Sequence, residues 1–353
     1  HVHSHGGHVH SHDGSAHEQV DSAGHEVASS SPVAFVPNPR IPTPRYVQRG
    51  AGRGRLLHLD AVSGLAGDML LAALFDLGVP VEVVTSQLQG LGLSGWRLEV
   101  QPVLVGALAA THVEVVLDEP QPLRDWAEIR VLLESAPLSA GIRERALAIF
   151  GRIAKAEAQV HGVSVDSVHF HEVGAVDSIV DIVGAAACFV HLGAKVLASP
   201  LPMGHGFVKA RHGILPLPAP ATITCLRGVP TYAVDLEAEL VTPTGACLVK
   251  ANAGAYTRWP SMRPVVTGFG AGTRRLPDRP NMLRVVLGDV DAARAGDDDT
   301  QGIHEVLETN LDDVSGQLSA HVTDALLRDG ALDAWTTPVG MKKGRPGVMV
   351  SAL

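Results

Sequence analysis

Cysteine is scarce in this 353-residue chain, which holds only Cys188, Cys225 and Cys247. Three scattered thiols exclude a disulfide framework, and their spacing does not match that of a structural zinc site. The N-terminal residues do not have the pattern of a signal peptide. We therefore expect a reduced, cytoplasmic protein.

Aromatic residues, cations and long apolar runs are also few. Aromatic residues make up 4% of the sequence, and 28 Lys and Arg stand against 37 Asp and Glu, a net charge of −9. Such a chain lacks the stacking platforms and the basic face that nucleic acid requires. The longest apolar run, residues 182–190, is shorter than the roughly 20 residues that span a bilayer. We expect neither a nucleic-acid nor a membrane partner.

Residues 1–55 differ in composition from the rest of the chain. They hold eight of the 18 histidines, spaced among Gly, Ser and Ala, and then a stretch rich in Pro and Arg. Such a segment buries too little apolar surface to offset its chain entropy, so we expect it to be disordered. Imidazoles at this density bind Ni²⁺, Zn²⁺ or Cu²⁺. A metal store and a solvated linker both remain open.

Hydrophobic residues make up 46% of the chain, enough for a sizeable core. Alternating strand and helix patterns over residues 56–288 predict a mixed α/β domain. An acidic linker is predicted at residues 289–302. Residues 303–353 have the order strand, helix, strand, strand, which begins a ferredoxin-like unit. We expect this unit to be cut short at the chain end, because its second helix and last strand are missing.

The densest group of chemistry-bearing side chains runs from His169 to Asp181. If residues 165–171 form a strand, His169 and His171 share one face of it, beside Glu172. Two carboxylates, Asp177 and Asp181, then lie four residues apart at the start of a helix, where a cation between them would offset their repulsion. The pattern predicts a metal or catalytic site. The alternative is an N-capped helix beside two surface histidines.

A second candidate lies where a strand at residues 56–59 passes through a Ser/Gly loop into a helix at residues 68–77. Backbone N–H groups at a helix start bind phosphate, and glycines let a ligand approach closely. The lysine of a P-loop is absent, so this is not that motif. The alternative is a plain capped turn. The candidate residues are Asp60, Ser63, Gly64, Gly67 and Asp68.

Three more segments complete the candidates in this domain. His205 and His212 lie in a Gly- and Pro-rich stretch that we expect to be a loop, and Thr242 and Thr244 lie in a polar turn leading into a helix. Residues 268–274 are rich in glycine but lack the spacing of a dinucleotide-binding loop. We expect a flexible loop there.

The last unit carries Lys342, Lys343 and Arg345 in a Gly-bounded loop, and Asp312 and Asp313 after its first strand. Cations of this kind bind phosphates, and the carboxylates bind Mg²⁺ or Mn²⁺. The combination predicts a site for a metal-bound triphosphate. A solvated basic turn is the alternative.

Taken together, these motifs resemble the nickel-insertion proteins of nickel-pincer cofactor biosynthesis (the LarC family). The resemblance runs from about residue 56 to residue 353. It rests on motifs in the family's order, at residues 60–69, 170–181, 218–222, 242–246, 308–313 and 341–346. Relatives often carry a His-rich tract inside the chain, near residues 118–121, and continue past residue 353; this sequence differs in both respects.

The resemblance implies a CTP-dependent nickel chelatase of the lyase class. Such enzymes insert Ni²⁺ into pyridinium-3,5-bisthiocarboxylic acid mononucleotide, and CTP is consumed to CMP and diphosphate with Mg²⁺ or Mn²⁺. Their product serves lactate racemase-like enzymes, and their C-terminal unit holds the CTP. The resemblance therefore implies that residues 56–288 hold nickel and substrate and that residues 303–353 bind CTP. We also expect a homo-oligomer.

From the residues and the resemblance together we assign three sets of roles. Metal binding is assigned to His169, His171, Glu172, Asp177, Asp181, His205, His212, Asp68, Asp312 and Asp313. Catalysis is assigned to His171, Glu172, Asp177 and Asp60. Cofactor binding is assigned to Ser63, Gly64, Gly67, Thr242, Thr244, Lys342, Lys343 and Arg345.

Two functions of other classes stay open from the residues alone. A non-catalytic nickel chaperone or storage protein would bind Ni²⁺ and leave CTP intact. A metal-dependent phosphohydrolase or nucleotidyltransferase would cleave CTP without the thiolated precursor.

Charge reversal at the basic loop tests the assignment of the nucleotide site. Lys342→Glu with Lys343→Glu is expected to weaken CTP binding at least tenfold, because two phosphate-binding cations become anions. Isothermal titration with CTP and Mg²⁺ measures the affinity. An unchanged affinity would place the nucleotide elsewhere.

Overall fold

The computed structural model describes residues 35–37, 46–168, 170, 175–210, 213–291, 306–312 and 314–353. The His-rich stretch and most of the predicted acidic linker lie outside these residues. So do five residues to which the sequence assigned a role, namely His169, His171, Glu172, His212 and Asp313.

The first unit is built on an eight-stranded mixed sheet with the order β1-β3-β4-β11-β12-β2-β5-β10. Parallel pairs (β2 with β5, β5 with β10) and antiparallel pairs (β3 with β4, β11 with β12, β12 with β2) occur side by side, which confirms the predicted α/β class. The strands are β1 Val36–Pro37, β2 Arg55–Asp60, β3 Trp96–Val105, β4 Leu108–Leu117, β5 Lys195–Ala198, β10 Ala255–Tyr256, β11 Met262–Ala271 and β12 Met282–Val290.

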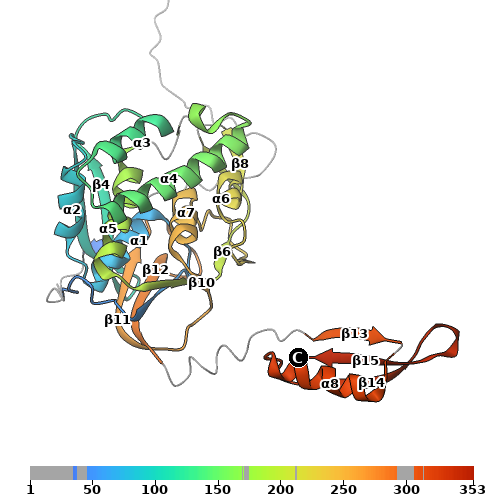
Figure 1. Ribbon diagram of the computed structural model, residues 1–353. Coiled ribbons are helices and arrows are strands. Elements are labelled where there is room, and N and C mark those ends of the chain that lie inside the picture. Colours follow the sequence, from blue (N-terminus) through green and yellow to red (C-terminus); the bar gives the residue numbers. More distant parts are fainter. Residues whose placement is uncertain are drawn as a thin grey trace, which may run out of the picture.

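Helices pack against this sheet in layers (Figure 1). Helix α1 lies directly on β4, β11 and β12, and α5 packs on α1, α2 and α4. Both α1 and α5 are apolar almost all round, as buried helices are. The helices are α1 Gly67–Leu77, α2 Val81–Gln89, α3 Trp126–Ser135, α4 Ala140–His161, α5 Val176–Leu192, α6 Pro220–Cys225 and α7 Pro243–Asn252. No described helix is long and apolar enough to cross a membrane.

Glycines in β11 allow α1 to lie unusually close to the sheet. A Cβ on Gly270 would fall 1.9 Å from the carbonyl oxygen of Met69, and one on Gly268 would fall 2.2 Å from that of Ala73. The expectation of a flexible loop at residues 268–274 is therefore wrong up to Ala271, because these glycines serve close packing within a strand.

Two other local predictions are also wrong. Val165–Ser167 is a 3₁₀ helix rather than part of a strand, since the amide and the hydroxyl of Ser167 both donate to the carbonyl of Ser164. The stretch expected to be loop holds strands: β6 Leu201–Met203 pairs with β9 Thr231–Ala233, and β7 Phe207–Ala210 pairs with β8 Gly213–Pro216. Pairing between strands satisfies the backbone hydrogen-bonding groups of these segments despite their Gly and Pro content.

The last unit has the predicted order of elements. Strand β13 (Leu307–Leu311), helix α8 (Gly316–Arg328), strand β14 (Ala334–Gly340) and strand β15 (Pro346–Ala352) form an antiparallel sheet of order β13-β15-β14 with one helix. The ferredoxin-like assignment stays a prediction. So does the division into domains, although β12 continues to Val290, past the boundary expected at residue 288.

Substitution of Gly270 tests the close packing of α1. Gly270→Ala is expected to lower the free energy of unfolding by about 1–3 kcal/mol or more, because the new methyl group collides with helix backbone. Urea denaturation measures the change. Gly254→Ala is the matched control, since its Cβ would meet only the carbonyl oxygen of Val196, at 3.8 Å. Equal effects of the two substitutions would contradict the packing argument.

Candidate functional site

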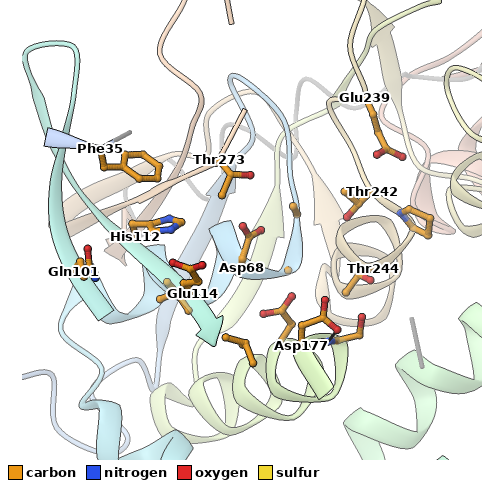
Figure 2. Close-up of a pocket in the computed structure, with 17 residues that line it drawn as sticks. Phe35, Asp68, Gln101, His112, Glu114, Asp177, Glu239, Thr242, Thr244 and Thr273 are labelled. Carbon is orange, nitrogen blue, oxygen red and sulfur yellow. Dashed lines mark hydrogen bonds between the residues drawn. The ribbon is translucent and has the colours of Figure 1, made fainter. Parts of the chain in front are cut away.

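Three helices begin at the wall of one cavity of about 570 Å³ (Figure 2). The cavity is lined by the first residues of α1 (Gly67, Asp68), of α5 (Asp177, Ser178) and of α7 (Pro243, Thr244). Helix N-termini carry unpaired N–H groups and partial positive charge, so their convergence favours an anionic ligand such as a phosphate.

Backbone contacts hold the starts of α1 and α7 together. The amide of Leu65 donates to the carbonyl of Leu240 at 2.8 Å, and the amide of Thr242 donates to the carbonyl of Leu65 at 3.1 Å. The Thr242 hydroxyl then caps α7 by accepting from the amide of Gly245. A Cβ on Gly245 would lie 2.2 Å from the Leu65 carbonyl oxygen, so glycine is required where the two segments touch.

Three carboxylates face the cavity, Asp68 from α1 and Asp177 and Asp181 from α5 (Figure 2 labels the first two). Asp68 accepts from the amide of Met69 and Asp177 from that of Ser178, each at 2.8 Å. Asp181 lies against Gly67, since a Cβ on Gly67 would fall 2.4 Å from Oδ2 of Asp181. The structure thus brings together three residues predicted as metal ligands and three, Gly67, Thr242 and Thr244, predicted to bind a cofactor.

Burial and mutual repulsion disfavour full ionisation of these carboxylates. Burial is the largest cause that raises the pKa of each of the three. The pKa of Asp181 is well above its usual range, because the charges of Asp68 and Asp177 add to the effect of burial. A cation bound among them would relieve the repulsion, and carboxylate oxygens are ligands for Mg²⁺, Mn²⁺ and other divalent ions.

Several cavity residues were missed by the sequence reasoning. They are His112 and Glu114 on β4, Gln101 on β3, Phe35, Glu239 and Thr273. The alternation of strand β4 does place His112 and Glu114 on one face. The sequence carries no signal that this face meets the start of α1.

The structure places four other predicted residues away from the cavity lining. Oδ2 of Asp60 accepts two hydrogen bonds from the Arg284 guanidinium, one of them from Nε at 2.9 Å. The two side chains thereby form an ion pair. The Ser63 hydroxyl donates to the carbonyl of Pro280 at 2.7 Å. Gly64 has a φ of 128° and lies against the Leu240 carbonyl. His205 is exposed and pairs with Asp235 at 3.0 Å.

In the last unit, the described residues among those predicted, Asp312, Lys342, Lys343 and Arg345, lie at one end of the sheet. Asp312 directly follows β13, and a 3₁₀ turn at Lys342–Gly344 joins β14 to β15. Leu311 pairs with Val348, so the end of β13 lies beside the start of β15. Arg345 closes the turn, since its carbonyl accepts from the amide of Met341 at 2.8 Å.

Within the described part of the chain, no three or more His, Cys, Asp or Glu side chains are arranged so that they could hold a metal ion by themselves. A cation bound by the carboxylates of the cavity would therefore need further donors, from other residues, from water or from a ligand.

A family model described as nickel insertion protein matches residues 57–353. The chain belongs to this family. It is 42% identical over 314 residues to the pyridinium-3,5-bisthiocarboxylic acid mononucleotide nickel insertion protein of Geobacillus kaustophilus, covering 85% of this chain and 76% of the relative.

Two further relatives carry the name "Putative nickel insertion protein". The relative from Thermomicrobium roseum is 47% identical over 303 residues, covering 85% of this chain and 73% of its own. The relative from Myxococcus xanthus is 48% identical over 303 residues, covering 85% of this chain and 76% of its own. No solved structure matches. The resemblance seen in the motifs is thus confirmed at the level of the family.

The raised pKa of Asp181 predicts how stability depends on pH. A carboxyl whose pKa is higher in the folded than in the unfolded state stabilises the fold below about pH 4, and this contribution is lost as pH rises through the raised pKa. Asp181→Asn removes the titration, so this variant is expected to gain stability relative to the parent between pH 4 and 7. Each unit of pKa difference corresponds to about 1.4 kcal/mol.

Urea denaturation at a series of pH values, without divalent cations, measures this difference. Exposed Asp166 provides the control as Asp166→Asn. Parallel stability curves for the parent and Asp181→Asn would show that the carboxylate is not destabilised by its surroundings.

Proposed function

We propose that this nickel insertion protein inserts Ni²⁺ into pyridinium-3,5-bisthiocarboxylic acid mononucleotide, forming the nickel-pincer cofactor while CTP is consumed to CMP and diphosphate. The observation that carries the proposal is the cavity at the start of three helices, with carboxylates on its wall. The printed name of the relative from Geobacillus kaustophilus supports the choice of substrate.

The chemistry of the substrate fits this wall. Its phosphate suits the N–H groups at the starts of α1, α5 and α7 and the hydroxyl of Thr244. Because Asp68, Asp177 and Asp181 would repel an anion, a divalent cation has to lie between them and the substrate. Because of the carboxylates, the substrate binds only with the cation, and the cation binds more tightly when the substrate is present.

His169, His171 and Glu172 are proposed as further nickel ligands and catalytic groups. They precede α5 by only a few residues in the sequence, and α5 supplies Asp177 and Asp181. Nitrogen and oxygen ligands bind Ni²⁺ firmly, yet they can yield it to a substrate with two sulfur donors. His205 and His212 stay proposed as additional ligands, Asp60 as a catalytic group, and Ser63 and Gly64 as cofactor-binding residues.

The last unit is proposed to bind CTP. Lys342, Lys343 and Arg345 would contact the phosphates, and Asp312 and Asp313 would hold Mg²⁺ or Mn²⁺. The cation would neutralise charge that develops as the bond between the α- and β-phosphates breaks. We further propose a cytoplasmic homo-oligomer that passes its product to a lactate racemase-like enzyme.

An omission series tests the proposed reaction. The chain is incubated with CTP, Mg²⁺, Ni²⁺ and the thiolated mononucleotide, each left out in turn, and CMP and the product mass are measured. We expect CMP only when the precursor is present, together with a nickel-containing product. His171→Ala is expected to abolish the product while the urea midpoint stays within error.

Two other outcomes would replace the proposal. Firm Ni²⁺ binding with no CMP would indicate a non-catalytic chaperone. CMP formed without the precursor would indicate a phosphohydrolase or nucleotidyltransferase.

A further inference from the structure

His112 is a buried histidine in the cavity wall with an unsatisfied ring nitrogen. Its side chain lies on β4, the residue is 6% exposed, and Nδ1 has no hydrogen-bond partner among the described residues. Leaving a buried polar atom unpaired destabilises a folded protein. Such a group in a folded protein calls for a ligand or a functional explanation.

The surroundings of His112 combine an apolar side and an acidic side. The ring of Phe35 packs on the imidazole, with 4.3 Å between ring centroids. The carboxylate of Asp68 interacts electrostatically with it across the cavity. Figure 2 shows the imidazole of His112 extending toward Asp68 at the start of α1.

Contacts at the far end of α1, the helix that carries Asp68, fix the position of His112. Asp76, in the last turn of α1, accepts from the Thr111 hydroxyl at 2.9 Å and from the amide of Phe269 at 2.8 Å. One side chain of α1 thus ties it to both β4 and β11. His112, the residue after Thr111, is held in register with the helix that carries Asp68.

We propose that His112 and Asp68 form a ligand pair that holds Ni²⁺ in the cavity before the metal passes to the substrate. The inference rests on the proposed function and adds a nitrogen donor that the motifs did not indicate. A neutral imidazole and a carboxylate suit a borderline cation such as Ni²⁺. This pair leaves the remaining coordination positions to the other proposed ligands, to water and to the sulfur donors of the substrate.

Nickel binding to the full chain tests the pair. Equilibrium dialysis over a series of free Ni²⁺ concentrations up to saturation, without CTP or precursor, compares the parent with His112→Gln and Asp68→Asn. We expect each variant to lose one equivalent, or to bind that equivalent at least tenfold more weakly. The N-terminal histidines are the same in all proteins, so their contribution cancels in the comparison.

His161→Gln is the matched control. His161 lies on α4, pairs with Glu157 and does not line the cavity. It should bind as many equivalents of Ni²⁺ as the parent. Equal binding by the parent and His112→Gln would overturn the ligand pair.

A second measurement needs no variant and covers the case in which His112→Gln fails to fold. The parent is loaded with Fe²⁺ in place of Ni²⁺ and treated with ascorbate and hydrogen peroxide, and oxidised peptides are mapped by mass spectrometry. Damage concentrated on residues 108–117 and 67–77 is expected. Damage confined to other segments would overturn the proposal.

The omission series separates this inference from the proposed function. A parent chain that forms the nickel product, with His112→Gln equally active and equally able to bind nickel, would leave the function standing and remove the ligand pair. A parent chain that binds nickel through His112 and Asp68 but forms no product would support the ligand pair and remove the proposed function.

Discussion

The site depends on a constraint of space, which is that the first turn of α1 has to touch α5, α7 and β11 at once. Glycine meets this constraint at each contact. Gly67 makes room for Asp181, Gly245 for the carbonyl of Leu65, and Gly270 for the backbone of α1. Without these approaches, the three helix starts would stand apart and the carboxylates would no longer share a cavity. The electrostatics of the site are therefore a consequence of backbone packing.

Sequence reasoning succeeded where local signals mark local structure. The acidic residues of α1 and α5 were placed because polar residues ahead of an apolar run mark the start of a buried helix. The structure then brought Asp68 and Asp177 to one cavity, although 109 positions separate them in the sequence. The order of elements in the last unit was likewise predictable from short alternating segments divided by Gly and Pro.

Sequence reasoning failed where long-range neighbours decide. The pattern of β4 shows which residues share a face, but β11, which lies beside it, comes from a segment about 150 residues later. His112 was missed for this reason. Asp60 shows the same limit, because the sequence marks the end of its strand but not its partner. Arg284 of β12 pairs with Asp60 and lies over Trp259, with 5.3 Å from the guanidinium carbon to the ring centroid. Only the pairing of β12 with β2 brings that arginine close.

Helix α1 bears a cavity-lining carboxylate at one end and a structural one at the other. Asp68 faces the cavity, while Asp76 binds β4 and β11. Each added or deleted residue would rotate one end by about 100° relative to the other and shift it by about 1.5 Å. Point changes in the apolar face can be absorbed by repacking, whereas a change of length cannot. The spacing between these two aspartates thus fixes the length of α1.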